Sequence, residues 1–455
     1  MNDKQQEKFI RMTTEPVGRL ICRLAVPTII SMMVTAAYNM VDTFFVGQLH
    51  SNSATGAVGV AFSLMAIIQA TGFFFGHGSG NYISMELGRQ NTDNASQMAS
   101  TAVVYALLAG SVILTLGQIF LTPLARLLGS TETILPYACD YLRIILIGAP
   151  YMTASFVLNN QLRFQGSAVY GMVGIVAGAV INVGLDPLLI FTCGMGVAGA
   201  ALATILSQLV SFCLLLVGCR RGGNLPIRLR NVRFRWRWFV QICRGGLPSL
   251  CRQSLMSVAT ICLNNAAGVY GDAAIAAMSV VQRAMMMVNS ALIGFGQGFQ
   301  PVCGFNHGAG RYSRVRQGYW FCVRWATLFL ATAGAVMFVL APRIIAVFRD
   351  DPAVIAFGTV AMRAQCCTLF LGAFNMISSM MTQTINKVWQ ASILAVARQG
   401  LFFIPVVLIL PQFLGAPGIQ LAQSVSDVCA FLLTVPLVAG VLRELTAAEK
   451  TPGGI

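Results

Sequence analysis

The residues of this chain that could do chemistry are a few acids placed inside long uncharged runs. Among fifteen Asp and Glu, Asp42, Asp186 and Asp427 lie well within apolar stretches, whereas most of the others lie in tails or connections. A charge at the middle of a bilayer is costly unless it is paired or hydrated, so such acids are functional candidates by default. The alternative for each acid is an interhelical hydrogen bond or salt bridge, and for Asp427 this structural role is the favoured one.

One of these acids belongs to a short polar constellation. Asn182 and Asp186 are four residues apart, so both project from one face of a helix. Pro187 follows at once and lacks an N–H, which leaves a carbonyl near Val183 without its helical partner. A carboxylate, an amide and a freed carbonyl suit a hard cation such as Na⁺, or equally a hydrated niche for a titrating carboxyl. Thr204, in the next apolar run, can add a hydroxyl.

The elements that must position these residues are membrane-spanning helices. Of the 455 residues, 56% are hydrophobic and only 10% are charged, and the mean hydropathy is +0.72. A soluble chain carries about 25% charged residues, and about 20 apolar residues suffice to cross the hydrocarbon layer. We therefore expect spanning helices over residues 20–46, 56–86, 95–124, 135–161, 166–191, 196–219, 239–265, 273–303, 315–341, 353–382, 388–411 and 416–442.

The chain also contains an internal repeat. A shift of about 220 residues places Pro27 on Pro248 and Gly199 on Gly418. The same shift aligns two glycine triplets at equal internal spacing, namely Gly76, Gly78 and Gly88 with Gly296, Gly298 and Gly308. Six helices per half predict two bundles of the same orientation, related by a pseudo-two-fold axis along the membrane normal. The predicted fold is an all-α polytopic membrane protein with twelve transmembrane helices in two six-helix bundles.

Basic residues are concentrated in alternate connections. The formal net charge is +15, arginines crowd residues 220–237, and Arg163 marks another basic connection. The positive-inside rule therefore places both termini and the central loop in the cytoplasm of a multi-pass plasma-membrane protein. Trp236 and Trp238 are interpreted as interfacial anchors and not as a stack for nucleic acid. The predicted organisation is a cytoplasmic tail over 1–19, an N-lobe over 20–219, a basic loop over 220–238, a C-lobe over 239–442 and a second cytoplasmic tail over 443–455.

Other chemistries receive little support from residue spacing. The thirteen cysteines are scattered without a CxxC motif, and His50, His77 and His307 lie far apart, so no structural metal site is expected. The sequence has no G-x-x-x-x-G-K-[ST] loop for ATP, so an ion gradient is the expected energy source. No nucleophile, base and orienting group form a recognisable set, and we expect neither an enzyme nor a bound cofactor.

Several segments together resemble one family. They are YNMVDTFFVGQL in the first helix, a G-x-G and LGR pattern at the end of the second, LNNQLRFQG after the fourth, and INVGLDPLLIF in the fifth. Their order and spacing, over essentially the full chain, are similar to the multidrug and toxic compound extrusion (MATE) transporters. The resemblance implies a V-shaped antiporter that expels organic cations or other amphipathic compounds in exchange for H⁺ or Na⁺. It implies small-molecule substrates and membrane lipids as partners, no nucleic acid, and function as a monomer.

The resemblance also assigns site residues. It implies that Asp42, Asn182, Asp186 and Thr204 form the family's amino-terminal-lobe cation site, with Asn160 in the same network. Asn159 is a nearly equal candidate for that last position. Some branches carry further acids in the second lobe, but the repeat partner of Asp42 is Cys262 or Leu263, and that of Asp186 is Pro405. The coupling site, whether for H⁺ or Na⁺, is therefore expected in the first lobe.

Three functional hypotheses follow from these observations. An ion-coupled multidrug exporter leads, because it accounts for the repeat and for the buried acids. A lipid or oligosaccharide flippase of related topology is the alternative, and extra helices or a strongly basic cavity would favour it. A membrane-embedded enzyme is the weakest of the three, since no catalytic set can be assembled.

Overall fold

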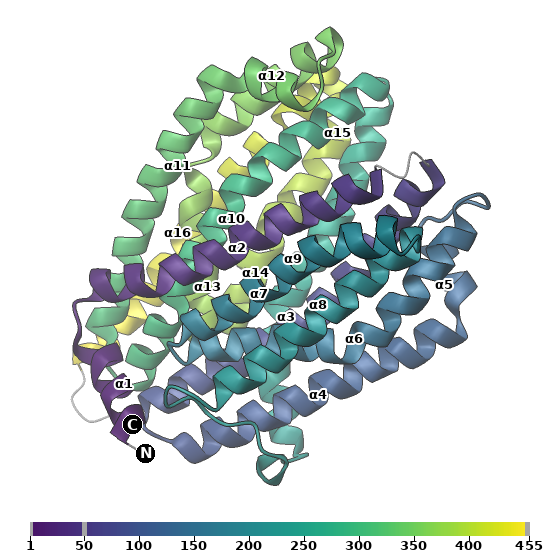
Figure 1. Ribbon diagram of the computed structural model, residues 1–455. Helices are drawn as coiled ribbons and strands as arrows, with labels where there is room; N and C mark the ends of the chain where they lie inside the picture. The colour runs from purple at the N-terminus through teal and green to yellow at the C-terminus, as the bar shows by residue number, and fades with distance from the viewer. Residues whose placement is uncertain (1–2, 48–51, 451–455) are drawn as a thin grey trace. The chain divides into compact units, whose positions relative to one another are not determined.

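Figure 1 shows the computed structural model, which is built from long helices. It describes residues 3–47 and 52–450, and several side chains beside residues 48–51, that of Asp42 included, lie outside the described set. The described residues contain no β-strand, so the prediction of an all-α chain is confirmed.

Each predicted span corresponds to one helix or to two or three consecutive helical segments. In the first half these are α2 (Val17–Gly47), α3 (Asn52–Gly88), α4 (Thr92–Ile119) with the short α5 (Leu121–Leu127), α6 (Leu135–Phe164), α7 (Ala168–Pro187) with the π-helix η1 (Leu188–Thr192), and α8 (Gly196–Cys219). In the second half they are α9 (Trp236–Gly268), α10 (Asp272–Gly308), α11 (Tyr312–Phe348), α12 (Pro352–Thr368) with α13 (Leu371–Thr384), α14 (Val388–Val396) with the π-helix η3 (Ala397–Phe403) and α15 (Ile404–Leu414), and α16 (Ala416–Lys450).

Helix α4 illustrates why these helices suit a membrane. Its inner face buries small residues such as Ala102, Ala106 and Gly110. Its outer face exposes large apolar side chains at helical spacing: Leu108, Val112, Leu116 and Ile119 are each more than half exposed. A helix that is apolar on both faces is stable only when lipid or protein covers the outer one.

Ten described helical spans are long and apolar enough to cross a membrane, and an eleventh is the pair α12 and α13, which is bent by 57°. We expected one straight helix over 353–382, and the structure breaks it at Leu369–Phe370. Helix α9 is long enough but less apolar, because its second half contains Arg252, Gln253 and the Asn264–Asn265 pair. It corresponds to the predicted helix over 239–265 and completes the set of twelve predicted helices.

The chain divides into two compact units. The first contains residues 1–14 and 26–246, and the second contains residues 15–25 and 247–455. The first eleven residues of this second unit lie mostly in the opening turns of α2, whereas the opening turns of α9 belong to the first unit. The observed units therefore differ from the predicted lobes 20–219 and 239–442 at these two helix starts. In both helices the change of unit lies next to a proline, Pro27 and Pro248, which the repeat pairs.

Within the first unit, α6 lies at the centre of the packing. It contacts α3, α4, α7 and α8, and α3, α4, α6 and α8 can be followed side by side in Figure 1. Its buried residues include Tyr141, Leu142, Ile145 and Leu146. In the second unit, α11 and α13 both pack against α10 and against α16.

The N-terminal segment, predicted only as a tail, contains a helix. This helix, α1 (Asp3–Thr14), buries Lys8, Met12 and Thr13. The Lys8 Nζ donates to Ser167 Oγ at 2.9 Å and to Asn224 Oδ1 at 2.6 Å. Helix α1 is therefore held on the connections that follow α6 and α8.

Backbone conformations support the internal repeat. Gln90 and Gly310, each two residues after the end of α3 or α10, have φ of 62° and 70°. Gly166 and Asn386, which follow α6 and α13, have φ of 74° and 61°. Both pairs are separated by the repeat shift of about 220 residues, so the same left-handed turns recur in both halves.

Candidate functional site

A stripe of small residues orients the polar pair on α7. The buried residues of this helix are Ala168, Gly171, Gly174, Gly178, Asn182 and Asp186, which share one helical face. This face packs on α8, since a Cβ at Gly174 would touch Leu215 and one at Gly178 would lie 3.1 Å from Ser211 Cβ. Small residues let the two helices approach closely. The inward direction of Asn182 and Asp186 thus follows from the same spacing that brings α7 onto α8.

The chain immediately after Asp186 is irregular. Helix α7 ends at Pro187 and continues as the π-helix η1, a form that is rare and frequent at functional sites. The prediction of a disturbed helix at this proline agrees with this geometry. Gly199, in the first turn of α8, lies against η1 so closely that a Cβ there would be 2.7 Å from the carbonyl oxygen of Leu189.

The three polar side chains of the predicted site are all buried. Asp186 is 0% exposed, and Asn182 and Thr204 are each 1% exposed. The Asn182 Nδ2 donates to Asp186 Oδ1 at 3.4 Å, and Asn182 Oδ1 is buried without a hydrogen-bond partner among the described residues. Thr204 donates its hydroxyl proton to the Ala200 carbonyl oxygen at 3.0 Å, so its oxygen retains lone pairs for another partner. The structure joins Asn182 to Asp186, and the participation of Thr204 in one cation site with them stays a prediction.

A cavity of about 260 Å³ adjoins Asn182. It lies within the first unit and combines large apolar side chains, such as Phe62, Met65 and Phe156, with neutral polar ones. The polar residues that line it are Thr35, Tyr38, Gln69, Ser155, Asn159, Asn182, Ser207, Gln208 and Ser211. Among the residues whose side chains the structure describes, a set that excludes Asp42, none that lines this cavity is charged. The sequence analysis did not select most of these residues, although uncharged polar residues within apolar helices were a usable signal.

Asn160 and Asn159 are directed differently. Asn160 donates to the Phe156 carbonyl oxygen at 2.7 Å and accepts from Arg163 Nη2 at 2.6 Å. Arg163 Nη2 is also 3.3 Å from His77 Nε2, and its guanidinium lies over the Phe164 ring. Asn159, in contrast, lines the cavity with Asn182. The role of Asn160 in the cation network stays a prediction, and its described contacts are with this Arg163 cluster.

Two expectations from the charge pattern were wrong. Arg163 was placed in a basic connection, but it lies in the last turn of α6 and is 3% exposed. Trp238 was expected at the membrane interface, but it is 6% exposed and packs edge-on against Tyr82 at 5.4 Å. Trp236 remains 76% exposed, as an interfacial residue should be.

Asp42 lies in α2, but its side chain is outside the described residues, so its part in the site stays a prediction. No group of three or more His, Cys, Asp or Glu within the described residues is arranged to hold a metal ion.

The third buried acid has an ionic partner. Asp427, on α16, accepts from Arg398 Nε at 2.7 Å and from Gln423 Nε2 at 3.0 Å. Arg398 lies in η3, so the pair joins two segments of the second unit. The structural role favoured for Asp427 is therefore confirmed, since its partner Arg398 lies in the same unit.

Comparisons with known proteins agree with this fold. Multidrug export protein MepA of Staphylococcus saprophyticus is 26% identical over 99% of both chains. An outward-facing multidrug resistance MATE family transporter of the MOP superfamily is 25% identical, with a TM-score of 0.90 over 96% of this chain and 98% of the other. A MOP superfamily transporter from Pyrococcus furiosus has the same identity and a TM-score of 0.90, over 97% and 99%; its binding pocket is described as having reverse polarity, which suggests a different function.

The family model named MatE matches residues 27–188 and again residues 248–437. The two matches begin at Pro27 and Pro248, the first pair of the internal repeat. Together they cover more than half of the chain, and the predicted resemblance is thereby confirmed. This chain belongs to the multidrug and toxic compound extrusion (MatE) family, which places it among membrane transporters and not among enzymes.

Proposed function

We propose that this chain is a secondary-active multidrug exporter that expels organic cations or other amphipathic compounds in exchange for H⁺ or Na⁺. The observation that carries the proposal is the fully buried Asp186, joined to Asn182 beside a cavity whose described lining is neutral and partly apolar. Such a lining suits amphipathic compounds, and polarizable methionines such as Met65 and Met152 adapt to different shapes.

The buried carboxyl supplies the coupling. Low dielectric surroundings disfavour a bare carboxylate, so Asp186 favours the state in which a proton or a cation neutralises it. Asn182 Oδ1 and the Thr204 hydroxyl oxygen are further donors for Na⁺. An ion changes the balance between two arrangements of the first unit only by its differential affinity for them. Substrate in the adjoining cavity competes with the ion directly or through that change, which yields antiport by alternating access.

The test is transport of a fluorescent cation in proteoliposomes under imposed pH or sodium gradients. Asp42→Asn and Asp186→Asn should remain folded and inserted yet reduce gradient-driven efflux to the background rate. Asp272→Asn, which changes an exposed acid at the start of α10, is the matched control and should transport normally. If both first-lobe variants export at the wild-type rate with unchanged ion dependence, the coupling site lies elsewhere.

A lipid or oligosaccharide flippase is the second candidate. The related Pyrococcus furiosus protein supports keeping it, because that transporter has this fold and a pocket of reverse polarity. A flippase for anionic lipid-linked substrates calls for a basic cavity, whereas no basic residue lines the cavity at Asn182 among the side chains that the structure describes. Movement of labelled lipid without efflux of the fluorescent cation, in the same proteoliposomes, would favour the flippase.

The proposed location is the plasma membrane, with both termini and the central loop in the cytoplasm and the monomer as the functional unit. The arginines of the 220–237 loop support this orientation. On a cysteine-free background, Leu229→Cys should resist an impermeant thiol reagent added outside cells, and Val269→Cys should react. Both positions are more than 80% exposed, so accessibility within the protein is matched. The opposite labelling pattern would reverse the orientation.

A further inference from the structure

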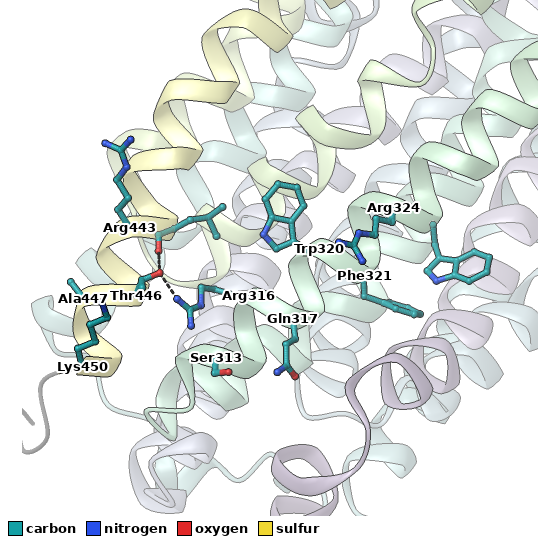
Figure 2. Close-up of a pocket in the computed structure, with 12 residues that line it drawn as sticks. Ser313, Arg316, Gln317, Trp320, Phe321, Arg324, Arg443, Thr446, Ala447 and Lys450 are labelled. Carbon is teal, nitrogen blue, oxygen red and sulfur yellow. Dashed lines mark hydrogen bonds between the residues drawn. The ribbon is translucent and has the colours of Figure 1, made fainter.

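A groove of about 1040 Å³ lies between the first turns of α11 and the last turns of α16, both in the second unit. Figure 2 shows its side chains. Four of the residues that line it are basic and none is acidic; the basic ones are Arg316, Arg324, Arg443 and Lys450. The groove is separate from the cavity at Asn182, which lies in the first unit.

The positive charges of this groove are only partly neutralised. Arg316 donates to Thr446 and forms an ion pair with Glu449. Arg324 and Arg443 are exposed, and neither has an ion pair or a side-chain hydrogen bond among the described residues. Glu444, the other acid nearby on α16, is paired with Lys387. Two guanidinium groups therefore remain available to an anion.

Exposed aromatic and apolar side chains lie along α11, within the groove and beyond it. Trp320 and Trp325 line the groove and are 43% and 55% exposed. Leu328 and Phe329 follow at helical spacing and are 57% and 45% exposed. Tryptophan is enriched at the level of lipid headgroups, and the exposed apolar side chains beyond it are suited to acyl chains. The groove thus offers positive charge at one end and a hydrocarbon surface at the other.

The axial distances fit a lipid. Arg316 and Arg324 are eight residues apart on one helix, which is about 12 Å along its axis. The headgroup region of one leaflet is several Å deep, and an arginine placed deeper extends its charged end toward it. Arg324 neighbours two tryptophans, a residue type that is enriched at the level of the lipid headgroups.

We propose that this groove binds an anionic phospholipid, with its phosphate on Arg324, a longer-range attraction from the charge of Arg443, and its acyl chains along Trp325, Leu328 and Phe329. Guanidinium groups match phosphate oxygens in geometry and charge. A zwitterionic lipid brings a cationic amine to a site that already has excess positive charge. A soluble phosphate ion has no acyl chains, so it would not contact the exposed apolar side chains of Leu328 and Phe329.

The test compares lipids on the purified full-length protein by native mass spectrometry. Phosphatidylglycerol and phosphatidylcholine are titrated against wild type, the double variant Arg324→Ala/Arg443→Ala, and Arg343→Ala. Arg343 is an exposed arginine on the same helix, about 28 Å away along its axis, and serves as the control for loss of charge alone. Wild type and the control should prefer phosphatidylglycerol, and the double variant should bind it about ten-fold less tightly, as expected when a charge-assisted hydrogen bond is lost.

Three results would overturn the proposal. They are equal affinity of the wild type for both lipids, unchanged phosphatidylglycerol affinity of the double variant, and displacement of the lipid by millimolar inorganic phosphate, which would indicate a soluble-anion site. The single variant Arg324→Lys keeps the charge but not the planar fork, and an intermediate affinity is expected. Each variant's apparent Tm without lipid separates loss of binding from loss of folding, and no transport measurement is involved.

Discussion

The two units differ most clearly at positions that the internal repeat makes equivalent. Gly178 and Gln208 line the cavity of the first unit. Their repeat partners, at shifts of 220 and 219 residues, are Arg398 and Asp427. At these positions the first unit has a glycine and a neutral glutamine beside a cavity. The second unit has the salt bridge between Arg398 and Asp427. The same arrangement of helices therefore contains a cavity in the first unit and an ion pair between η3 and α16 in the second.

This difference is the basis on which we propose different roles for the two buried acids Asp186 and Asp427. Asp427 is matched by a cation and an amide, and such a pair fixes η3 against α16. Asp186 accepts from the amide of Asn182 at 3.4 Å, and Asn182 in turn lines the cavity of the first unit. A buried acid in a membrane protein is thus not by itself a coupling site, and the neighbouring side chains decide which role it has.

The largest expected effect is the loss of stability that follows from breaking the Arg398–Asp427 ion pair of the second unit. Asp427→Asn leaves the Arg398 charge without its partner, and because Arg398 is 30% exposed we expect a loss of about 2 to 3 kcal/mol, below the full buried-pair cost. The apparent Tm in detergent measures this. The double variant Arg398→Met/Asp427→Leu should recover most of the stability. If that double variant folds but loses ion-coupled transport, the Arg398–Asp427 ion pair takes part in coupling. The proposed difference between the two units is then wrong.

A second prediction tests the equivalence of the two units. A Cβ at Gly199 would lie 2.7 Å from the Leu189 carbonyl oxygen, and one at Gly418 would lie 2.7 Å from that of Leu410. Because backbone atoms cannot move aside cheaply, Gly199→Ala and Gly418→Ala should each destabilise the protein by about 1 to 3 kcal/mol. Gly184→Ala and Gly440→Ala, which meet open space, are the controls and should be neutral. Unequal losses at Gly199 and Gly418 would show that the repeat is not preserved in packing.

A third prediction makes the first unit resemble the second. Gly178→Val places a side chain at the position that Arg398 occupies in the repeat. It should narrow the cavity and reduce efflux of the fluorescent cation about ten-fold, the effect of a few methyl groups in a binding pocket. The measurement is the efflux rate of the fluorescent cation for Gly178→Val and wild type at matched protein levels. An unchanged rate would mean that substrate does not use this cavity.

The smallest expected effect is a dependence of the docking of α1 on pH. Burial, with a smaller contribution from the charge of Arg11, lowers the pKa of the Lys8 amine to about 7. The undocked lysine, with a pKa near 10.5, binds more protons above pH 7, so docking of α1 strengthens as pH rises through that range. The gain is about 1 kcal/mol between pH 7 and 8. Amide exchange of α1, corrected for intrinsic rates, should show it, and Lys8→Met should abolish the pH dependence.

The sequence was sufficient for the helices and for the repeat. Apolar runs of spanning length, separated by prolines and glycines, determine where helices form, because a chain in lipid must satisfy its backbone hydrogen bonds within each segment. The pairing of Asn182 with Asp186 on one face was likewise a consequence of spacing along a helix. Helix α1 was missed because its residues are mostly polar and show no spanning pattern.

Only the tertiary structure decided which polar residues share a site. Asn159 and Asn160 are adjacent in sequence, yet one lines the cavity and the other binds Arg163. Neighbours on a helix point in directions about 100° apart, so adjacency cannot say which of them faces a given helix. The ion pair between Arg398 and Asp427 joins residues 29 positions apart, and the repeat provided no counterpart for it. Such contacts depend on how helices pack, which the hydrophobic pattern of each helix alone does not specify.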